Sequence, residues 1–204
     1  MTGRNRVTPT GAIEEFALRG AWTGNRGILH RGREIVRFHA GERWITCALE
    51  FRGRWREQWG PNRWTPLYFH DEAVAFAAGH RPCGECRHGQ YTAYREAWSE
   101  RLRVPPPAAK ELDRRLHGER LVPGTHRRRF HDLPWAGLPD GTFVLREGRP
   151  ALVLDGHLIE WTRQGYGPRF SRPRTGPATV LTPPSTVAAL RAGCPVQIDE
   201  GARR

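Results

Sequence analysis

The chain has 204 residues, 38% of them hydrophobic, which is enough to bury one medium core or two small ones without disulfides. Its formal net charge is +12, from 33 basic and 21 acidic side chains, and this excess predicts a polyanion partner such as a nucleic acid. No apolar run reaches the roughly 18 residues of a membrane span, and residues 1–7 lead into no signal peptide, so we expect a cytoplasmic protein that avoids membranes.

The first third of the chain predicts a small antiparallel sheet. Residues 1–27 show little periodicity and are interpreted as an arm or a loosely attached strand. Short alternating segments follow at residues 34–38, 43–51 and 64–69, each bounded by Gly, Pro or Asn. Such segments are typical of strands joined by tight turns.

The middle of the chain predicts three helices. Asp71 is a good N-cap for a helix over residues 72–78, which Gly79 ends. A second helix is expected from about residue 86 to 102, and three consecutive prolines at 105–107 prevent its continuation. A third is expected over residues 110–120.

The last third predicts a β-rich part. After an Arg- and His-rich connection at 121–139, strands are expected at residues 143–146, 151–154, 158–161 and 179–181, followed by a helix over 185–192. The dipeptide at 155–156, Asp-Gly, is a strong type I′ hairpin signal. We therefore predict an α+β fold, with a zinc-stapled sheet-and-helix module at 1–135 and a β-hairpin-rich part at 136–204 that can pack with it as one domain.

Two thiols, those of Cys83 and Cys86, form a Cys-x-x-Cys pair just before the second helix. A pair with this spacing can hold one metal ion from a single turn, and the N–H groups of the following helix stabilise thiolates. A reducing cytoplasm disfavours a disulfide between them. The alternatives are a redox-active pair and two simply buried thiols.

A tetrahedral zinc site needs two more ligands. Cys47, in the middle of a predicted strand, is our first choice for the third, and Cys194 is the second choice. We favour His30 for the fourth, because it lies in the same sheet region as Cys47, whereas His80 is too close to Cys83. The histidines considered for this position are His30, His39, His70 and His80.

A family resemblance covers residues 69–87, which read Phe-His-Asp-Glu-Ala-Val-Ala-Phe-Ala-Ala-Gly-His-Arg-Pro-Cys-Gly-Glu-Cys-Arg. This stretch resembles the second half of the zinc domain of the Ada family of bacterial DNA-repair proteins. The resemblance implies zinc and a role in DNA repair. In that family two upstream cysteines complete the site, and one zinc-bound thiolate accepts a methyl group from damaged DNA phosphate. This chain has only Cys47 upstream, which would be the acceptor here.

A second resemblance gives an alternative function. Residues 82–87 are similar to the second metal motif of zinc-dependent cytidine deaminases, which also need a His or Cys followed one residue later by a catalytic Glu. The nearest match places Glu50 three residues after Cys47, where a strand points the two side chains to opposite faces. A helix also stands where those enzymes have a strand.

Three side chains form a candidate catalytic group: His117, Glu119 and His126. Imidazole and carboxylate are the usual general acids and bases, so the group predicts hydrolysis of a phosphodiester. The alternative is a polar helix end followed by a solvated basic loop.

Arginine supplies nearly all of the positive charge, since Lys110 is the only lysine. Guanidinium groups bind phosphate bidentately, and neighbouring indoles can stack on bases, although codon bias would also enrich arginine. We expect about half of Trp44, Trp55, Trp59 and Trp64 to be core residues. The predicted nucleic-acid-binding residues are Arg26, Arg52, Arg54, Trp55, Arg56, Arg63 and Arg87.

Taken together, these features predict a zinc-containing DNA-binding protein of DNA repair or processing, acting by damage recognition or by nuclease- or glycosylase-like chemistry. The alternatives are a nucleobase or nucleoside deaminase and a non-catalytic zinc-dependent regulator. The ligand count separates them, because a catalytic zinc keeps one position open whereas a structural zinc has four protein ligands.

Overall fold

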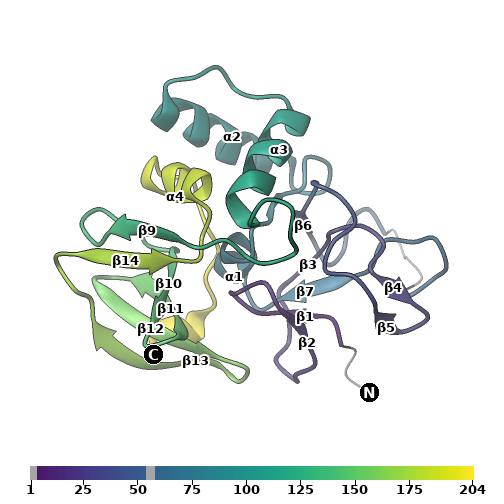
Figure 1. Ribbon diagram of the computed structural model, residues 1–204, viewed down its shortest axis with the longest axis horizontal. Helices are drawn as coiled ribbons and strands as arrows, with labels where there is room; N and C mark the ends of the chain where they lie inside the picture. Colours follow the sequence, from purple (N-terminus) through teal and green to yellow (C-terminus); the bar gives the residue numbers. More distant parts are fainter. Residues whose placement is uncertain (1–3, 54–57) are drawn as a thin grey trace.

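The protein has an α+β fold, seen in a computed structural model that describes residues 4–53 and 58–204 (Figure 1). Its helices are α1 (Glu72–Ala77), α2 (His88–Leu102), α3 (Ala109–Arg120), α4 (Pro184–Arg191) and a 3-10 helix, η1 (Glu200–Arg203). Within the described residues, no helix combines the length and apolar character needed to cross a bilayer.

The N-terminal sheet has the strand order β2-β1-β7-β3-β6-β8. Its strands are β1 (Arg6–Val7), β2 (Ile13–Glu14), β3 (Trp22–Asn25), β6 (Ile45–Cys47), β7 (Leu67–Phe69) and β8 (Arg81–Pro82). The β1–β7 and β6–β8 pairs are parallel, so this sheet is mixed. The prediction of an antiparallel sheet is therefore wrong for these two pairs. A separate hairpin is formed by β4 (His30–Arg31) and β5 (Glu34–Ile35).

Residues 4–25, expected to be an arm or loose strand, instead supply three strands of this sheet. β1 and β3 flank β7, inside the sheet. Gly24 allows β3 to approach β6, because a Cβ built there would lie 2.1 Å from the carbonyl oxygen of Ile45. Strands this short have too few residues to show a period in the sequence.

The C-terminal sheet is antiparallel, with the order β13-β12-β11-β10-β14-β9. Its strands are β9 (His131–Pro134), β10 (Phe143–Arg146), β11 (Arg149–Leu154), β12 (His157–Thr162), β13 (Gly165–Ser171) and β14 (Pro177–Val180). The predicted turn at Asp155 and Gly156 is confirmed by their φ angles of 49° and 74°. β9 lies in the stretch expected to be a connection, because only its pairing with β14 makes it a strand.

The predicted cap of α1 is also confirmed. The Asp71 side chain accepts a hydrogen bond from the N–H of Val74 at 2.8 Å, and Gly79 has the positive φ of 88° that ends a helix. α1 lies between the two sheets in Figure 1. Its Phe76 packs in a second cluster with Tyr94 of α2, Leu116 of α3 and Leu190 of α4, so the helices share one core.

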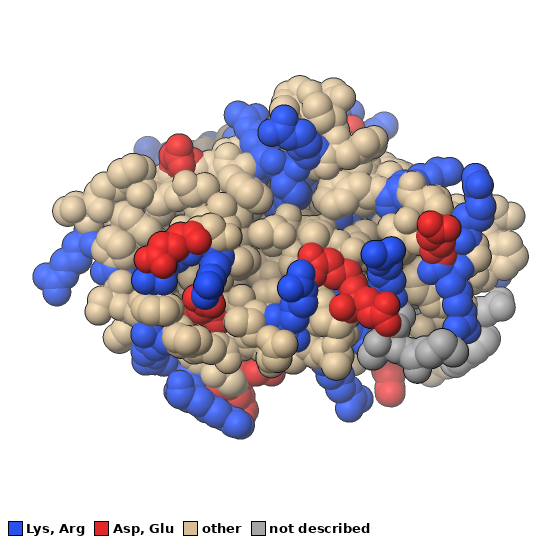
Figure 2. Space-filling model, turned by 60° about the horizontal axis from the view of Figure 1, so that its bottom comes forward, with Lys and Arg blue, Asp and Glu red and all other residues tan. Residues whose placement is uncertain are grey.

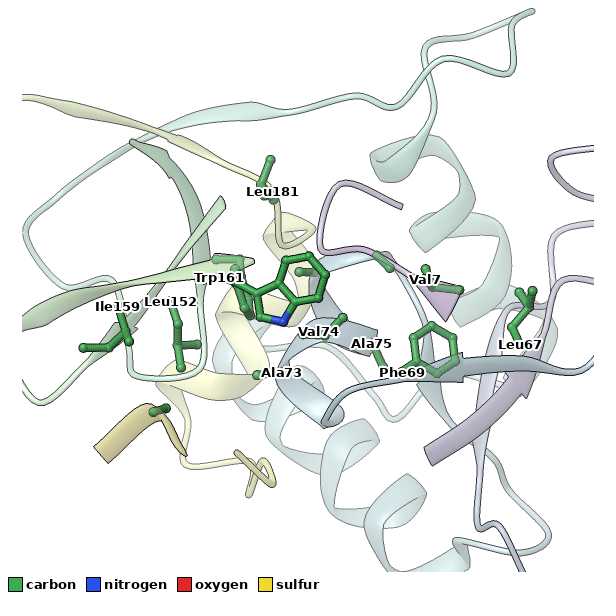
Figure 3. Packing of buried hydrophobic residues seen from close by; sticks show 14 of the residues in the cluster. Val7, Leu67, Phe69, Ala73, Val74, Ala75, Leu152, Ile159, Trp161 and Leu181 are labelled. Carbon is green, nitrogen blue, oxygen red and sulfur yellow. The ribbon is translucent and has the colours of Figure 1, made fainter. Parts of the chain in front are cut away.

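The largest hydrophobic cluster joins the two sheets (Figure 3). It contains Phe69 of β7 and Val74 of α1 together with Leu152 of β11 and Trp161 of β12. Hydrophobic side chains from the predicted N-terminal module and from the C-terminal part therefore pack in one cluster. The Cys-x-x-Cys turn follows the buried helix α1 and the short strand β8.

Candidate metal centre

The pairing of two short strands brings Cys47 to the Cys-x-x-Cys turn. β6 and β8 run parallel, with Thr46 opposite Pro82, and the N–H of Cys83 donates to the carbonyl oxygen of Thr46 at 2.9 Å. Cys47 ends β6 and Cys83 directly follows β8. The register therefore sets these two thiols side by side, although 35 residues separate them along the chain.

The three sulfur atoms form a compact group that fits a metal ion. The Sγ atoms of Cys47, Cys83 and Cys86 all lie within 4.8 Å of one another. A tetrahedral ion with metal–sulfur bonds of about 2.3 Å separates its sulfurs by about 3.8 Å, so small side-chain movements complete the site. Cys83 is 8% exposed, and Cys47 and Cys86 are half-buried. An ion held here therefore remains accessible from solvent.

The thiols have unequal proton affinities. The Cys47 thiol and the N–H groups of Cys86 and Glu85 stabilise the Cys83 thiolate, which lowers the pKa of Cys83 to about 5. Burial raises the pKa of Cys86, and the hydrogen bond to Cys83, followed by burial, raises the pKa of Cys47. Without a metal the group thus holds one thiolate and two thiols, and a metal must displace two protons to bind all three sulfurs.

Two buried ion pairs hold the turn on either side. Before it, Arg81 donates two hydrogen bonds to the carboxylate of Asp113 on α3, both at 2.7 Å. After it, Arg87 lies 2.5 Å from the carboxylate of Glu72 on α1 and donates to Thr46 Oγ1 at 3.0 Å. These contacts anchor the cysteine turn to both helices and to β6.

Arg87 was predicted to bind nucleic acid, and this prediction is corrected. The residue is only 4% exposed, and its guanidinium lies 3.8 Å from the centre of the Trp22 ring. A guanidinium paired with Glu72 inside the protein has no free face for phosphate. Arg87 is therefore a positioning residue of the cysteine turn.

The structure does not bring His30 to the thiols. Its Nδ1 lies 2.6 Å from Thr65 Oγ1, and its ring packs edge-on against Trp59 at 5.2 Å. β4, which carries His30, pairs only with β5 among the described strands. Cys194 also lies apart and donates a weak hydrogen bond to the carbonyl oxygen of Pro195 at 3.6 Å. Among the described residues, the compact group contains the three cysteines and no histidine.

Arg26 is likewise corrected as a nucleic-acid contact, because it is fully buried. Its guanidinium lies 4.1 Å from the centre of the Trp44 ring and donates to Nε2 of His80 at 3.3 Å. Burial, with neighbouring arginines, keeps the pKa of His80 far below its usual value. His80 is thus a neutral acceptor inside the core and lies outside the metal group.

The remaining predicted nucleic-acid contacts follow β6 in the sequence. Arg52 and Arg63 are exposed, while Arg54, Trp55 and Arg56 lie outside the described residues. Trp44 is buried, and Trp59 and Trp64 are half-buried. On the face shown in Figure 2, basic side chains are spread among acidic and uncharged ones.

The predicted catalytic group is divided by the fold. His117 and His126 both approach His39, which is 78 residues from His117 and was considered in the sequence only as a zinc ligand. Glu119 lies at α4 instead, where its carboxylate accepts from the N–H of Ser185 at 2.9 Å and from its hydroxyl at 2.6 Å. The predicted grouping of Glu119 with the two histidines is corrected, because its carboxylate faces Ser185 and Arg115 while the rings face His39.

Replacing Glu119 with alanine is expected to cost about 1–2 kcal/mol of unfolding free energy, because the first turn of α4 loses a capping acceptor. Urea unfolding measures this cost. Glu96→Ala, at an exposed position of α2, is the control and should change stability by less than about 0.5 kcal/mol. Equal stability of the two variants would contradict a capping role for Glu119.

Comparison with protein-family models, curated proteins and solved structures gives no match for this chain. The chemistry of the site must therefore be argued from its own residues. Three clustered thiols can hold one metal ion, and the described residues supply no fourth cysteine or histidine to that group. Such a site can bind a further ligand from solvent.

Proposed function

We propose that this chain is a zinc-containing DNA-binding protein that acts in DNA repair or processing. The observation that carries the proposal is the convergence of Cys47, Cys83 and Cys86 within 4.8 Å in a chain of net charge +12. The similarity of residues 69–87 to the Ada zinc domain supports the same function. Soft thiolates in a tetrahedral arrangement favour zinc over hard cations such as magnesium.

A zinc ion held by three thiolates has one position left for water or another ligand. That position favours a zinc that takes part in ligand binding or chemistry over one that only stabilises the fold. The two buried ion pairs next to the turn support such a role, because they fix the sulfurs while leaving Cys47 and Cys86 partly exposed. The site thus combines rigid positioning with access.

The proposal is tested by metal analysis of the purified protein, followed by binding to labelled single-stranded, duplex and abasic DNA. We expect about one zinc per chain. A metal-free protein that also fails to take up added zinc under reducing conditions would overturn the zinc part. A protein that binds none of the three DNAs at low salt would overturn the DNA part.

Phosphate contacts made by Arg52 and Arg63 should appear in the salt dependence. Replacing both with alanine is expected to reduce the slope of log affinity against log salt by about two, since each phosphate contact contributes about one. Arg101→Ala/Arg114→Ala removes the same charge from exposed helix positions and is the control. Equal slopes for the two double variants would show that general charge, and not this pair of arginines, sets the affinity.

A further inference from the structure

Three histidines from distant parts of the chain meet at the surface. His39 follows the β4–β5 hairpin, His117 lies on α3, and His126 lies on the connection from α3 to β9 (Figure 1). The His39 ring centre lies 5.2 Å from that of His117 and 5.1 Å from that of His126. His126 Nδ1 and His39 Nε2 are 3.2 Å apart and share a hydrogen bond. His126 is exposed, and the other two are half-buried.

Two buried arginine side chains lie behind these rings. Arg26 and Arg120 are fully buried, with their guanidiniums 4.1 Å and 4.4 Å from the centre of the Trp44 ring. The His39 ring packs against the same indole at 5.8 Å. Within the described part of the chain, neither arginine forms an ion pair. Arg120 donates to the carbonyl oxygens of Gly79, Glu42 and Asp113, and Arg26 donates to one carbonyl oxygen and to His80.

Arg128 is half-buried and adds a third guanidinium, which within the described residues donates to the carbonyl oxygens of Ala77, Ala78 and Leu181. Burial, followed by the charges of Arg128 and Arg120, lowers the pKa of Arg26 well below its usual value. The carboxylate of Asp113 acts on Arg120 but is paired with Arg81, so the group keeps an excess of positive charge. Six buried nitrogens of the region also have no partner among the described residues: His39 Nδ1, His80 Nδ1, His117 Nδ1, Arg26 Nη2, Arg120 Nε and Arg128 Nε.

We propose that His39, His117 and His126 form a binding site for a phosphate group, backed by the buried charges of Arg26 and Arg120. Imidazole N–H groups donate hydrogen bonds to phosphate oxygens, and these bonds are charge-assisted where a ring is protonated. The field of the arginines lowers the energy of an anion at this place. The site shares no residue with the three cysteines, so it does not depend on zinc.

The proposed site should couple phosphate binding to proton uptake. Burial lowers the pKa of His39, and His117, His126, Arg120 and Arg26 lower it further. Burial and then Arg120 lower the pKa of His117, while Glu42 raises it. Both rings are therefore neutral at neutral pH. A bound phosphate favours the protonated rings and raises their pKa values, so affinity should rise as the pH falls through the range in which His39 and His117 take up protons.

NMR titration of the histidine ring protons of the full chain tests this inference. The probes are inorganic phosphate and a thymidine dinucleotide, whose single phosphodiester charge is constant over this pH range. We expect phosphate, but not chloride at equal ionic strength, to shift His39, His117 and His126 and to raise the pKa of the first two. Binding of the dinucleotide would identify a nucleic-acid backbone as the ligand, and binding of inorganic phosphate alone would identify a phosphate monoester.

The variant His126→Gln should weaken binding of the positive probe about tenfold, because it removes one imidazole donor at an exposed position. The matched control is His157→Gln in the C-terminal sheet, which should bind normally. Absence of any shift with both probes, or equal loss in the two variants, would overturn the proposal. Loss of zinc or of DNA binding would leave the result with inorganic phosphate unaffected, so the two proposals fail separately.

Discussion

Replacing Cys47 with serine is expected to reduce bound zinc from about one ion per chain to nearly none. Cys47 is the only one of the three clustered cysteines that β6 supplies, and without it the turn offers two thiolates. Two ligands from one turn do not complete a tetrahedral site. Structural zinc contributes about 10–16 kcal/mol of apparent binding free energy in zinc-finger peptides, so loss of a ligand should also lower the melting temperature.

The measurement is metal analysis by mass spectrometry together with competition against a zinc-binding dye. Cys194→Ser is the matched control, because it removes a buried thiol that lies outside the compact group. It should keep the full zinc content. Zinc retained at wild-type affinity by Cys47→Ser, or lost equally from both variants, would contradict a three-cysteine site.

Replacing Asp113 with alanine is expected to cost about 3–5 kcal/mol of unfolding free energy. The change leaves the Arg81 guanidinium buried without the carboxylate that accepts both of its 2.7 Å hydrogen bonds. The side chains of Arg81 and Asp113 are only 4% and 8% exposed, so solvent cannot replace the lost partner. Because Arg81 lies two residues before Cys83, zinc affinity should fall as well.

Urea unfolding and zinc competition measure these two effects. Glu111→Ala removes an exposed carboxylate from the same helix and should cost less than about 1 kcal/mol. Asp113→Asn retains one acceptor oxygen and should recover part of the stability. An Asp113→Ala variant as stable as Glu111→Ala would show that the buried pair contributes nothing to the fold.

Local chemistry made several elements predictable. The cap of α1 by Asp71 depends on residues within one turn, as does the hairpin turn at Asp155 and Gly156. The Cys-x-x-Cys pair is also local, since its spacing alone places two sulfurs on one turn. Such features need no information from distant parts of the chain.

The exposure of the individual arginines could not be predicted from the sequence. Arg26 and Arg87 have the same side chain as the exposed Arg52 and Arg63, and only burial distinguishes them. Arg87 is neutralised by Glu72, whereas Arg26 stacks on Trp44 without a carboxylate. Composition counts each arginine equally, so it overstates the charge that is available on the surface.

The sequence by itself determined the α+β class, the capped helix before the paired cysteines and the type of the hairpin turn, because each depends on neighbouring residues. The sequence also ranked Cys47 first as the third thiol, and the structure brings it to the pair. Only the tertiary structure decided that His30 and Glu119 lie elsewhere and that His39 joins His117 and His126. The physical reason is that these meetings depend on strand register and helix packing, which a single sequence does not specify between distant residues.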